Sequence, residues 1–588
     1  MISGRDDNPC RPRHFKPPPC GPMPASGPVR QSLETIYTRL LLMTVLFGLV
    51  FVGISGRLID LMWLKDGDPK LARAHVRPHI EISRADILDR NGVALATTLE
   101  GPSVYADPKQ MAAAGVDPTE AARKLATVLP GVDVPDLAKR LGSDHGFAWI
   151  RRQLTPDEEA RVNGLGIPGI FFQNEQRRIY PQGPLAAHVI GYVGIDNKGF
   201  AGIERGLDDE LKTSDDPLEL SIDVRLQYIL QEEIQQQITA FNAKGGMGII
   251  ADVNTGEILA LTSLPEFDPN AVRNADPKSL FNRATLGTYE MGSVFKIFNT
   301  AMALDDHVTT LQSSFDATQP IHVGRFTIHD DHAKARWLTV SEIFMYSSNI
   351  GSAKMAVQAG IDRQQDFLGR LGLLKEPKIE IPEVGRPEIP HPWHLINTMT
   401  VAFGHGISVS PLQMVVATSA VVNGGVLHRA TFLKRASGSH PDGARVLSES
   451  TSEDMRRLLR LVVERGTGKF AAAPGYLVGG KTGTAEKVEG HHYAEKELLS
   501  SFIGVFPINQ PRYIILVSID TPHGTAKSGG EATGGWVAAP AVSRIVQRMA
   551  PIEGIPPVDE DSPEIRRALL VNSGPNSAPA SVPKLAAN

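Results

Sequence analysis

Cysteine is nearly absent from this chain of 588 residues: Cys10 and Cys20 are the only two, and both precede the one long apolar segment. A fold of this length therefore cannot depend on a disulfide framework and must rest on ordinary hydrophobic cores. Dense basic stripes are absent as well, and with a net charge of −5 nothing suggests a nucleic-acid partner. No internal repeat is found. The length exceeds what one compact core holds, so several structural units are expected.

Uninterrupted apolar sequence is rare in the chain and concentrates near its start. The 17 residues from Leu40 to Gly56 carry no charge and are bounded by Arg39 and Arg57. As a helix this run measures about 26 Å, close to the thickness of the bilayer hydrocarbon, and Trp63 suits the interface beyond it. No small-x-small cleavage site precedes Arg57, so we interpret residues 40–63 as a transmembrane anchor. A cleaved signal peptide and a buried core helix are the alternatives.

The two ends of the chain are predicted to be disordered. Residues 1–39 contain eight prolines, and residues 556–588 are rich in proline, serine and asparagine. The six basic residues of the first tail favour a cytoplasmic location, but basic residues near the span lie on both sides of it. Charge alone therefore does not decide the orientation.

The region between the anchor and the second tail divides at a polar break around residues 213–217. Residues 64–215 mix short helices and strands, including a hairpin over residues 87–95 with Asn91-Gly92 as its type I′ turn. Residues 216–555 combine two strands, a long mostly helical block, three more strands and a closing helix, which predicts an α+β domain with helices packed on an antiparallel sheet. The expected elements are a helix over 224–241, strands over 246–253 and 257–263, helices within 281–423, strands over 476–484, 501–506 and 513–520, and a helix over 539–549.

A serine and a lysine open the helical block with a spacing that suits nucleophilic catalysis. In Ser293-Val294-Phe295-Lys296, Gly292 precedes an apolar helical run. Serine at a helix N-terminus lies at the positive end of the dipole, which favours a developing oxyanion. Lys296 lies one turn further on the same face and is a competent base if burial or a second cation lowers its pKa.

Two further motifs follow in the order that this chemistry needs. Ser347-Ser348-Asn349 lies between predicted helices, where a hydroxyl and a carboxamide two positions apart can face a cleft. Lys481-Thr482-Gly483-Thr484 lies on a predicted strand, where Gly479 and Gly480 would let a substrate backbone approach closely. The lysine adds a cation, and the two threonines add hydroxyls suited to a carboxylate.

Each motif alone is weak, because four-residue patterns recur by chance. Ser581-Val582-Pro583-Lys584 repeats the first pattern in the tail, and a plain turn and an edge strand would explain the other two. In this order, on helix, loop and strand, the three together are highly specific for serine β-lactamases and penicillin-binding proteins.

With these residues in place, the chain resembles a class B penicillin-binding protein of the FtsI type, a cell-division transpeptidase. The resemblance runs from the anchor to about residue 550 and includes further matching stretches: Arg84 with Asp89-Arg90-Asn91-Gly92, Arg178-Ile179-Tyr180-Pro181, Gly202-Ile203-Glu204, Ser221-Ile222-Asp223, residues 252–260 and residues 404–413. It implies that residues 64–215 form a non-catalytic pedestal of the dimerisation type and that residues 216–555 form the transpeptidase domain. Met291, Val294 and His405 depart from the usual family residues, but none of them removes a functional group that the chemistry needs.

The resemblance also assigns roles to the motif residues. Ser293 would be the acylated nucleophile, Lys296 its proton acceptor, and Ser347 a proton relay towards the leaving amine. Asn349 would bind the substrate amide, Lys481 would hold Ser347 electrostatically, and Thr482, Gly483 and Thr484 would bind the substrate, the two threonines holding its terminal carboxylate. The N–H groups of Ser293 and Thr484 would form the oxyanion hole. No cofactor or metal is expected.

The implied function is a peptidoglycan D,D-transpeptidase that cross-links stem peptides ending in D-Ala-D-Ala, releases D-Ala, and is inhibited by β-lactams. Its expected location is the bacterial inner membrane at the septum, with one span and a periplasmic catalytic domain. Its expected partners are a membrane glycosyltransferase and other proteins of the division machinery. An elongation-specific transpeptidase is the main alternative, and a membrane-bound β-lactam sensor is less favoured. A β-lactamase is disfavoured because the Glu-x-x-Leu-Asn loop of one such class is not found. His329-Asp330-Asp331-His332 suggests a metal cluster, but we interpret it as a solvated turn.

Overall fold

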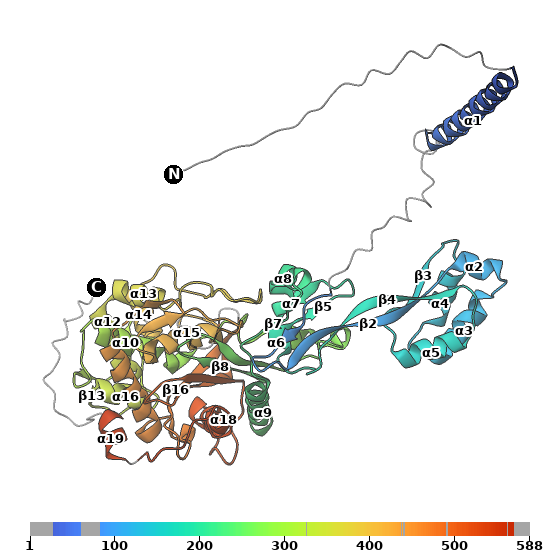
Figure 1. The fold of residues 1–588 in the computed structure, drawn as a ribbon. Coiled ribbons are helices and arrows are strands. Elements are labelled where there is room, and N and C mark those ends of the chain that lie inside the picture. Colours follow the sequence, from blue (N-terminus) through green and yellow to red (C-terminus); the bar gives the residue numbers. More distant parts are fainter. Residues whose placement is uncertain are drawn as a thin grey trace, which may run out of the picture. The chain divides into compact units, whose positions relative to one another are not determined.

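The computed structural model describes residues 27–59, 83–324, 326–436, 438, 441–489, 492–560 and 562–569 (Figure 1). The chain separates into two units, one before and one after the boundary between Glu81 and Ile82. The predicted pedestal and transpeptidase domain both belong to the second unit, so the boundary predicted near residue 215 stays a prediction.

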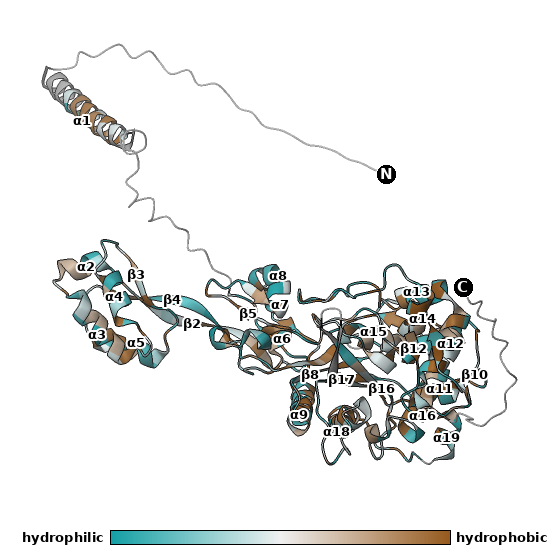
Figure 2. Cartoon of the chain, turned by 180° about the vertical axis from the view of Figure 1, so that it is seen from behind, coloured by the Kyte–Doolittle hydropathy of each residue, from teal (hydrophilic) through white to brown (hydrophobic). Residues whose placement is uncertain are grey.

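The described part of the first unit is one helix, α1 (Gly27–Ile59). Residues Thr38–Gly56 make it long and apolar enough to cross a membrane, and Figure 2 shows the hydrophobic stretch along it. Its large apolar side chains are exposed, which fits a membrane anchor better than a core helix. The helix begins at Gly27, so the predicted disordered tail is too long where it includes residues 27–39. Pro28 is tolerated in the first turn of a helix, and residues 29–39 contain no proline or glycine that would interrupt it.

The second unit begins with a five-stranded sheet in which β2 (Ala94–Ala106) pairs with β4 (Ile170–Ile179) along ten positions. β3 (Ala148–Arg151) and β1 (Ile87–Leu88) also pair with β2, and β7 (Leu218–Glu219) pairs with β1. Four helices pack a small apolar core at one end of this sheet, and each starts with a capping residue followed within two positions by proline. They are α2 (Pro108–Ala113), α3 (Pro118–Val128), α4 (Val134–Leu141) and α5 (Pro156–Gly164).

The predicted hairpin is present, but its turn differs from the prediction. Asp89 accepts hydrogen bonds from the backbone of Asn91 and Val93, at 2.8 Å each, and only Gly92 has a positive φ. A type I′ turn needs positive φ at both central positions, so the turn is not of that type. The side chain of Asp89 holds the loop instead.

Buried charges join the base of the pedestal into one network. The carboxylate of Glu204 forms ion pairs with Arg84 Nε at 2.5 Å and with Arg178 Nε at 2.7 Å. Arg84 forms a second ion pair, with Asp208 at 2.7 Å. Arg84, Arg178 and Glu204 come from stretches that the sequence matched to the family. The short elements around them are α6 (Ala187–Ile190), β5 (Tyr192–Val193), β6 (Gly199–Ala201), α7 (Gly202–Gly206) and α8 (Asp208–Thr213).

The part of the chain that carries the three motifs is built on an antiparallel sheet, as the strand pattern predicted, and the strand order is β16-β17-β18-β8-β9. Its strands are β8 (Gly245–Asp252), β9 (Ile258–Leu264), β16 (Gly479–Glu489), β17 (His492–Phe506) and β18 (Tyr513–Asp520). β16 and β17 extend beyond the predicted strands because the polar stretch between them continues the hairpin, and polar sequence at a sheet edge gives no hydrophobic signal.

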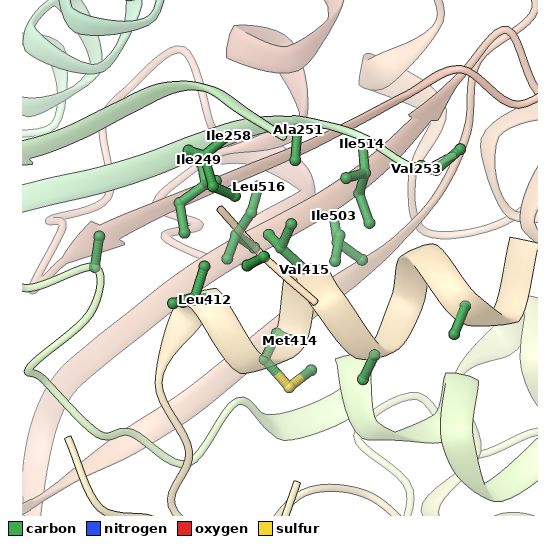
Figure 3. Close-up of a cluster of buried hydrophobic side chains, with 14 of the residues drawn as sticks. Ile249, Ala251, Val253, Ile258, Leu412, Met414, Val415, Ile503, Ile514 and Leu516 are labelled. Atoms are coloured by element: carbon green, nitrogen blue, oxygen red, sulfur yellow. The ribbon is translucent and has the colours of Figure 1, made fainter. Parts of the chain in front are cut away.

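Both faces of this sheet are covered by helices, which explains why its central strands are almost continuously apolar. On one face, Leu412 and Val415 of α15 (Pro411–Val422) lie towards Ile249 and Leu516 of the sheet, whereas Met414 points away from it (Figure 3). On the other face, α9 (Val224–Ala240) and α18 (Ala539–Ile552) cover the alternate residues of the same strands. β16, the strand that carries the third motif, pairs with β17, whose residues Phe502 and Ile503 belong to these two cores.

The remaining helices and short strands complete this part of the chain. The helices are α10 (Lys296–Asp305), α11 (Val340–Tyr346), α12 (Asn349–Ala359), α13 (Ile361–Arg370), α14 (Leu395–Val401), α16 (Glu449–Arg465), α17 (Gly534–Val537) and α19 (Pro563–Leu569). The short strands are β10 (Ser314–Asp316), β11 (Ile321–Val323), β12 (Phe326–Ile328), β13 (Trp337–Thr339), β14 (Val426–His428) and β15 (Gly443–Arg445). Short 3₁₀ turns are η3 (Val272–Asn274), η4 (Pro277–Leu280), η5 (Gly292–Phe295) and η6 (Lys469–Ala471).

The predicted disorder of residues 556–588 is wrong for the first part of that segment. Glu560 pairs with Arg460 at 2.7 Å, and α19 packs Ile565 and Leu569 against the core. These contacts were not evident from the proline-rich composition. Residues 570–588 lie outside the described residues.

Candidate active site

The candidate nucleophile lies on a tight turn that only glycine permits. Ser293 belongs to η5, which leads directly into α10. Gly292 has a φ of +53°, and a Cβ at this position would lie 2.5 Å from the carbonyl oxygen of Thr484. The missing side chain therefore lets β16 pack directly against the serine turn and places the first and third motifs in contact.

Lys296 is the centre of the polar contacts around the serine. Its Nζ lies 2.9 Å from Ser293 Oγ, 3.0 Å from Ser347 Oγ and 2.7 Å from Asn349 Oδ1, and it donates to the Ser347 carbonyl at 2.5 Å. The side chain is completely buried. The structure thus brings together the candidate nucleophile, the candidate base and two residues of the second motif.

Burial shifts the ionisation of both lysines. Desolvation lowers the pKa of Lys296 to about 7, although the carboxylates of Asp330 and Asp331 act in the opposite direction. Lys481 is also fully buried, and its Nζ lies 2.9 Å from Ser347 Oγ, on which both lysines converge. Desolvation and the nearby charge of Lys296 lower the pKa of Lys481 well below its usual value. One neutral amine beside Ser293 is therefore available near neutral pH.

The third motif faces the cleft through its threonines. Thr482 Oγ1 lies 2.7 Å from the hydroxyl of Thr467, and Thr484 Oγ1 accepts from the backbone of Gly534 at 3.1 Å. Both threonines line a cleft of about 450 Å³ together with Ser293 and Ser347. Hydroxyls with a free proton in such a cleft suit a carboxylate.

The glycines of this strand serve the packing of the protein itself. A Cβ on Gly483 would lie 2.6 Å from the Met291 carbonyl, and one on Gly480 would lie 2.5 Å from the Ile503 carbonyl. A Cβ on Gly479 would meet Ile508 at 2.7 Å. The sequence-based expectation that Gly479 and Gly480 make room for a substrate backbone is therefore wrong, because protein atoms fill that space.

The second motif is held by Asp330, a residue that the sequence interpretation left in a solvated turn. Its carboxylate accepts from the backbone of Asn349 at 2.6 Å and of Ile350 at 2.9 Å, and from Ser348 Oγ at 2.7 Å. Asp330 therefore caps the first turn of α12 and is no ordinary loop residue. Among the described residues, no group of three or more His, Cys, Asp or Glu side chains is placed to hold a metal ion.

Asn349 is predicted to bind the substrate amide, but in this structure its side chain is hydrogen-bonded to the protein itself. Its Oδ1 accepts from Lys296, and its Nδ2 donates to the His329 carbonyl at 3.0 Å. In this arrangement the carboxamide positions the lysine. The second N–H of Nδ2 remains for a substrate amide, because the carboxamide nitrogen carries two donors and only one is given to the His329 carbonyl.

Several residues of the cleft carry no motif signal. Phe470 and Trp536 form an exposed aromatic pair with ring centroids 4.5 Å apart, and they line the cleft with Thr467, Glu531 and Thr533. They lie on segments that reach the site only through the tertiary fold. A glycine-rich flank, such as Gly466-Thr467-Gly468, was the only local signal for any of them.

We expect Asp330→Asn to weaken the fold and to shift the pH dependence of the reaction. The change removes a charged acceptor from three donors, so the free energy of unfolding should fall by about 1–3 kcal/mol. The pH midpoint of acylation should also move to lower pH, because Asp330 raises the pKa of Lys296. Urea unfolding and acylation rates with a fluorescent penicillin measure the two effects. Asp331→Asn is the matched control: it should shift the midpoint in the same direction without destabilising the protein. Unchanged stability in Asp330→Asn would contradict the capping role.

Comparison with known proteins agrees with this geometry. The family model for the penicillin-binding protein transpeptidase domain matches residues 246–547, and the model for the penicillin-binding protein dimerisation domain matches residues 79–239. The chain is 40% identical, over 92% of both chains, to the probable peptidoglycan D,D-transpeptidase FtsI of Caulobacter vibrioides. This chain belongs to the class B penicillin-binding proteins of the FtsI type. FtsI of Escherichia coli K12, a further relative of the same type, is 29% identical over 82% of this chain and 86% of its own.

Solved structures share the fold of this class B penicillin-binding protein. Penicillin-binding protein 3 from Mycobacterium tuberculosis, complexed with aztreonam, is similar with a TM-score of 0.64 and 24% identity, over 82% of this chain and 98% of that one. The transpeptidase domain of penicillin-binding protein 3 from Burkholderia pseudomallei is similar with a TM-score of 0.52 and 33% identity, over 58% of this chain and 98% of that domain.

Proposed function

We propose that this class B penicillin-binding protein is the peptidoglycan D,D-transpeptidase that cross-links stem peptides of the septal wall. The observation that carries the enzymatic part is the position of the fully buried Lys296, whose Nζ lies 2.9 Å from Oγ of Ser293 on the wall of the cleft. The relatives named peptidoglycan D,D-transpeptidases support the same reaction.

The first half of the reaction forms an acyl-enzyme. Neutral Lys296 accepts the hydroxyl proton of Ser293 as Oγ attacks the carbonyl carbon of the penultimate D-Ala. The carbonyl oxygen becomes an oxyanion, for which the N–H groups of Ser293 and Thr484 are the proposed donors. When the peptide C–N bond breaks, the proton passes through Ser347 to the departing amine, and D-Ala is released.

The second half returns the enzyme to its starting state. The amine of a second stem peptide attacks the ester, gives up its proton along the same route, and Ser293 leaves as the free hydroxyl. The contacts of Ser347 Oγ with both lysines, at 3.0 and 2.9 Å, support this relay. Lys481 orients Ser347, while Thr482 and Thr484 hold the terminal carboxylate of the donor. Asn349 positions Lys296 through Oδ1 and offers the second N–H of its amide to the substrate.

β-Lactams enter the same pathway, because their strained amide acylates Ser293 and leaves no separate amine to depart. Rapid hydrolysis of that ester would make the chain a β-lactamase. The exposed apolar helix α1 and the matched dimerisation domain favour a wall-building enzyme. A β-lactam sensor is disfavoured, because the described residues contain one helix long and apolar enough to cross a membrane.

The cellular setting follows from the substrate. α1 anchors the protein in the inner membrane with the catalytic part on the periplasmic side, where peptidoglycan is assembled. The two matched family domains include no glycan polymerase, so the enzyme works with a membrane glycosyltransferase and other proteins of the division machinery. An elongation-specific role is the second candidate, since elongation transpeptidases use the same three motifs.

Depletion of the protein in its own bacterium, followed by microscopy, tests the septal role. We expect filaments with unfinished septa, because lateral wall synthesis continues while septal cross-linking stops. Re-expression of the wild-type chain should restore division, and a Ser293→Ala chain at the same level should not. Rounded cells that still divide would assign the enzyme to elongation.

A further inference from the structure

A second cleft, remote from the three motifs in sequence, is lined by an unusual set of side chains. It has a volume of about 670 Å³, and its walls come from β3, β4, the β5–β6 turn and residues 269–274. Among the described residues, its lining contains no aspartate or glutamate but contains five arginines: Arg151, Arg152, Arg177, Arg178 and Arg273. In a protein with a net charge of −5, this cleft is a local concentration of positive charge.

Neighbouring carboxylates neutralise only part of this charge. Arg152 pairs with Glu175 at 2.6 Å and approaches Asp196 at 3.6 Å, Arg151 approaches Glu158 at 3.7 Å, and Arg178 pairs with Glu204 at 2.7 Å. Arg177 and Arg273 have no ion pair or side-chain hydrogen bond within the described part of the chain. Two guanidinium groups thus remain available to an incoming anion, and their planar forks match carboxylate geometry.

Arg178 supplies a second, independent observation. It is only 7% exposed, and its Nε donates to Glu204 while Nη1 donates to Thr98 Oγ1 at 2.9 Å and to the Arg84 carbonyl at 3.2 Å. Its Nη2 is buried without an acceptor among the described residues. Buried donors are nearly always paired, so one donor of this guanidinium group is left unsatisfied by the surrounding protein.

An aromatic cluster adjoins the arginines. Trp149 lines the cleft and has Phe147 at 4.9 Å and Tyr105 at 6.1 Å between ring centroids, and Tyr105 in turn contacts Phe171 at 5.6 Å. Phe147 is 44% and Phe171 37% exposed. The Arg152 guanidinium lies 5.1 Å from the Trp149 ring centroid, which joins the aromatic and basic parts into one surface. Arginine, tryptophan and tyrosine are the residues that dominate binding at protein interfaces.

We propose that this arginine-lined cleft docks an acidic segment of another protein. Carboxylates of the segment pair with Arg177 and Arg273, and an aromatic or aliphatic side chain of the same segment covers the exposed rings. A free phosphate would use the two available arginines but would leave the aromatic surface uncovered, and a neutral glycan would leave Arg177 and Arg273 without an anion. The strand that carries Arg177 and Arg178 is mostly hydrophilic (Figure 2), as expected for a surface that meets a charged partner.

Binding of a defined peptide to the full-length protein in detergent micelles tests the proposal. The probe is a fluorescein-labelled peptide of six glutamates and two phenylalanines, followed by fluorescence anisotropy at low and moderate salt. We expect the peptide to bind the wild type with an affinity that falls as the salt concentration rises. In the Arg177→Gln/Arg273→Gln variant the affinity should be lower by about tenfold or more. Arg161→Gln is the matched control, because Arg161 is an exposed arginine of α5 that does not line the cleft. A glutamine-for-glutamate peptide should not bind.

The competing occupants give distinct results. Equal peptide affinity in wild type and the double variant would overturn the proposal. Full displacement by inorganic phosphate at the concentration of the peptide would reduce the cleft to a simple anion site. Tighter, arginine-dependent binding of a disaccharide-peptide fragment of peptidoglycan would assign it to the wall polymer instead. Penicillin acylation of each variant checks its fold independently, and a wild-type protein that is not acylated would refute the proposed function without affecting this docking surface.

Discussion

Full-length protein mixed with penicillin should gain the mass of one penicillin, and Ser293→Ala should gain none. Ser293 Oγ is the one hydroxyl of the first motif, and it lies 2.9 Å from a buried amine that can accept its proton. Removing it leaves the cleft intact but takes away the atom that forms the ester, so the loss should be complete within the sensitivity of intact-mass measurement.

The chain offers its own matched control for this experiment. Ser581 is followed three residues later by Lys584, the same spacing as the first motif. Ser581→Ala should be acylated like the wild type, since spacing alone does not create a site. An adduct that persists in Ser293→Ala, or one that disappears in Ser581→Ala, would place the nucleophile elsewhere.

Lys296→Arg should lower the acylation rate by about 10²–10⁴-fold, the usual contribution of a general base. Arginine keeps the positive charge but does not become neutral in the accessible pH range, so it cannot accept the serine proton. In the wild type, the neutral amine forms as the pH rises through the Lys296 pKa of about 7. The rate should therefore rise with pH, by about tenfold per unit below 7, and level off above it.

Rates of acylation by a fluorescent penicillin between pH 5 and pH 9 measure both effects. Lys354→Arg, on α12 and outside the lining of the active-site cleft, is the matched control and should keep the wild-type profile. A Lys296→Arg rate equal to that of the wild type would assign the base to another group. A rate that falls as the pH rises through 7 would mean that the charged lysine is the active form.

The elements with a strong local pattern were predictable from the sequence. β18 begins and ends at the predicted residues, and α9 differs from its prediction by one residue, because apolar periodicity and flanking turn residues determine them locally. Polar segments were less predictable. The ends of β16 and β17, the helical start of α1 and the ordering of α19 depend on a continuing hairpin, on helix propensity and on tertiary packing.

The candidate site shows the same division between short motifs and tertiary contacts. The serine, the two lysines and the second motif were identified from spacing, and the structure brings them within hydrogen-bond distance of one another. Asp330 was missed because its partners are 18–20 residues away and no local pattern reports a capping contact across such a loop. Phe470 and Trp536 were missed because only the folded chain brings η6 and α17 to the cleft.

The central claim, that Ser293 transfers a stem peptide through an ester, is tested most directly with a peptide ending in D-Ala-D-Ala and an acceptor amine. Incubation with the full-length protein, followed by mass spectrometry of the quenched enzyme and of the products, should show an acyl group on the peptide containing Ser293. It should also show one released D-Ala for each cross-linked product, with hydrolysed donor making up any excess of D-Ala. Ser293→Ala should show neither product nor acyl group. Cross-linked product formed by Ser293→Ala, or wild-type turnover with the acyl group on a different residue, would contradict the account.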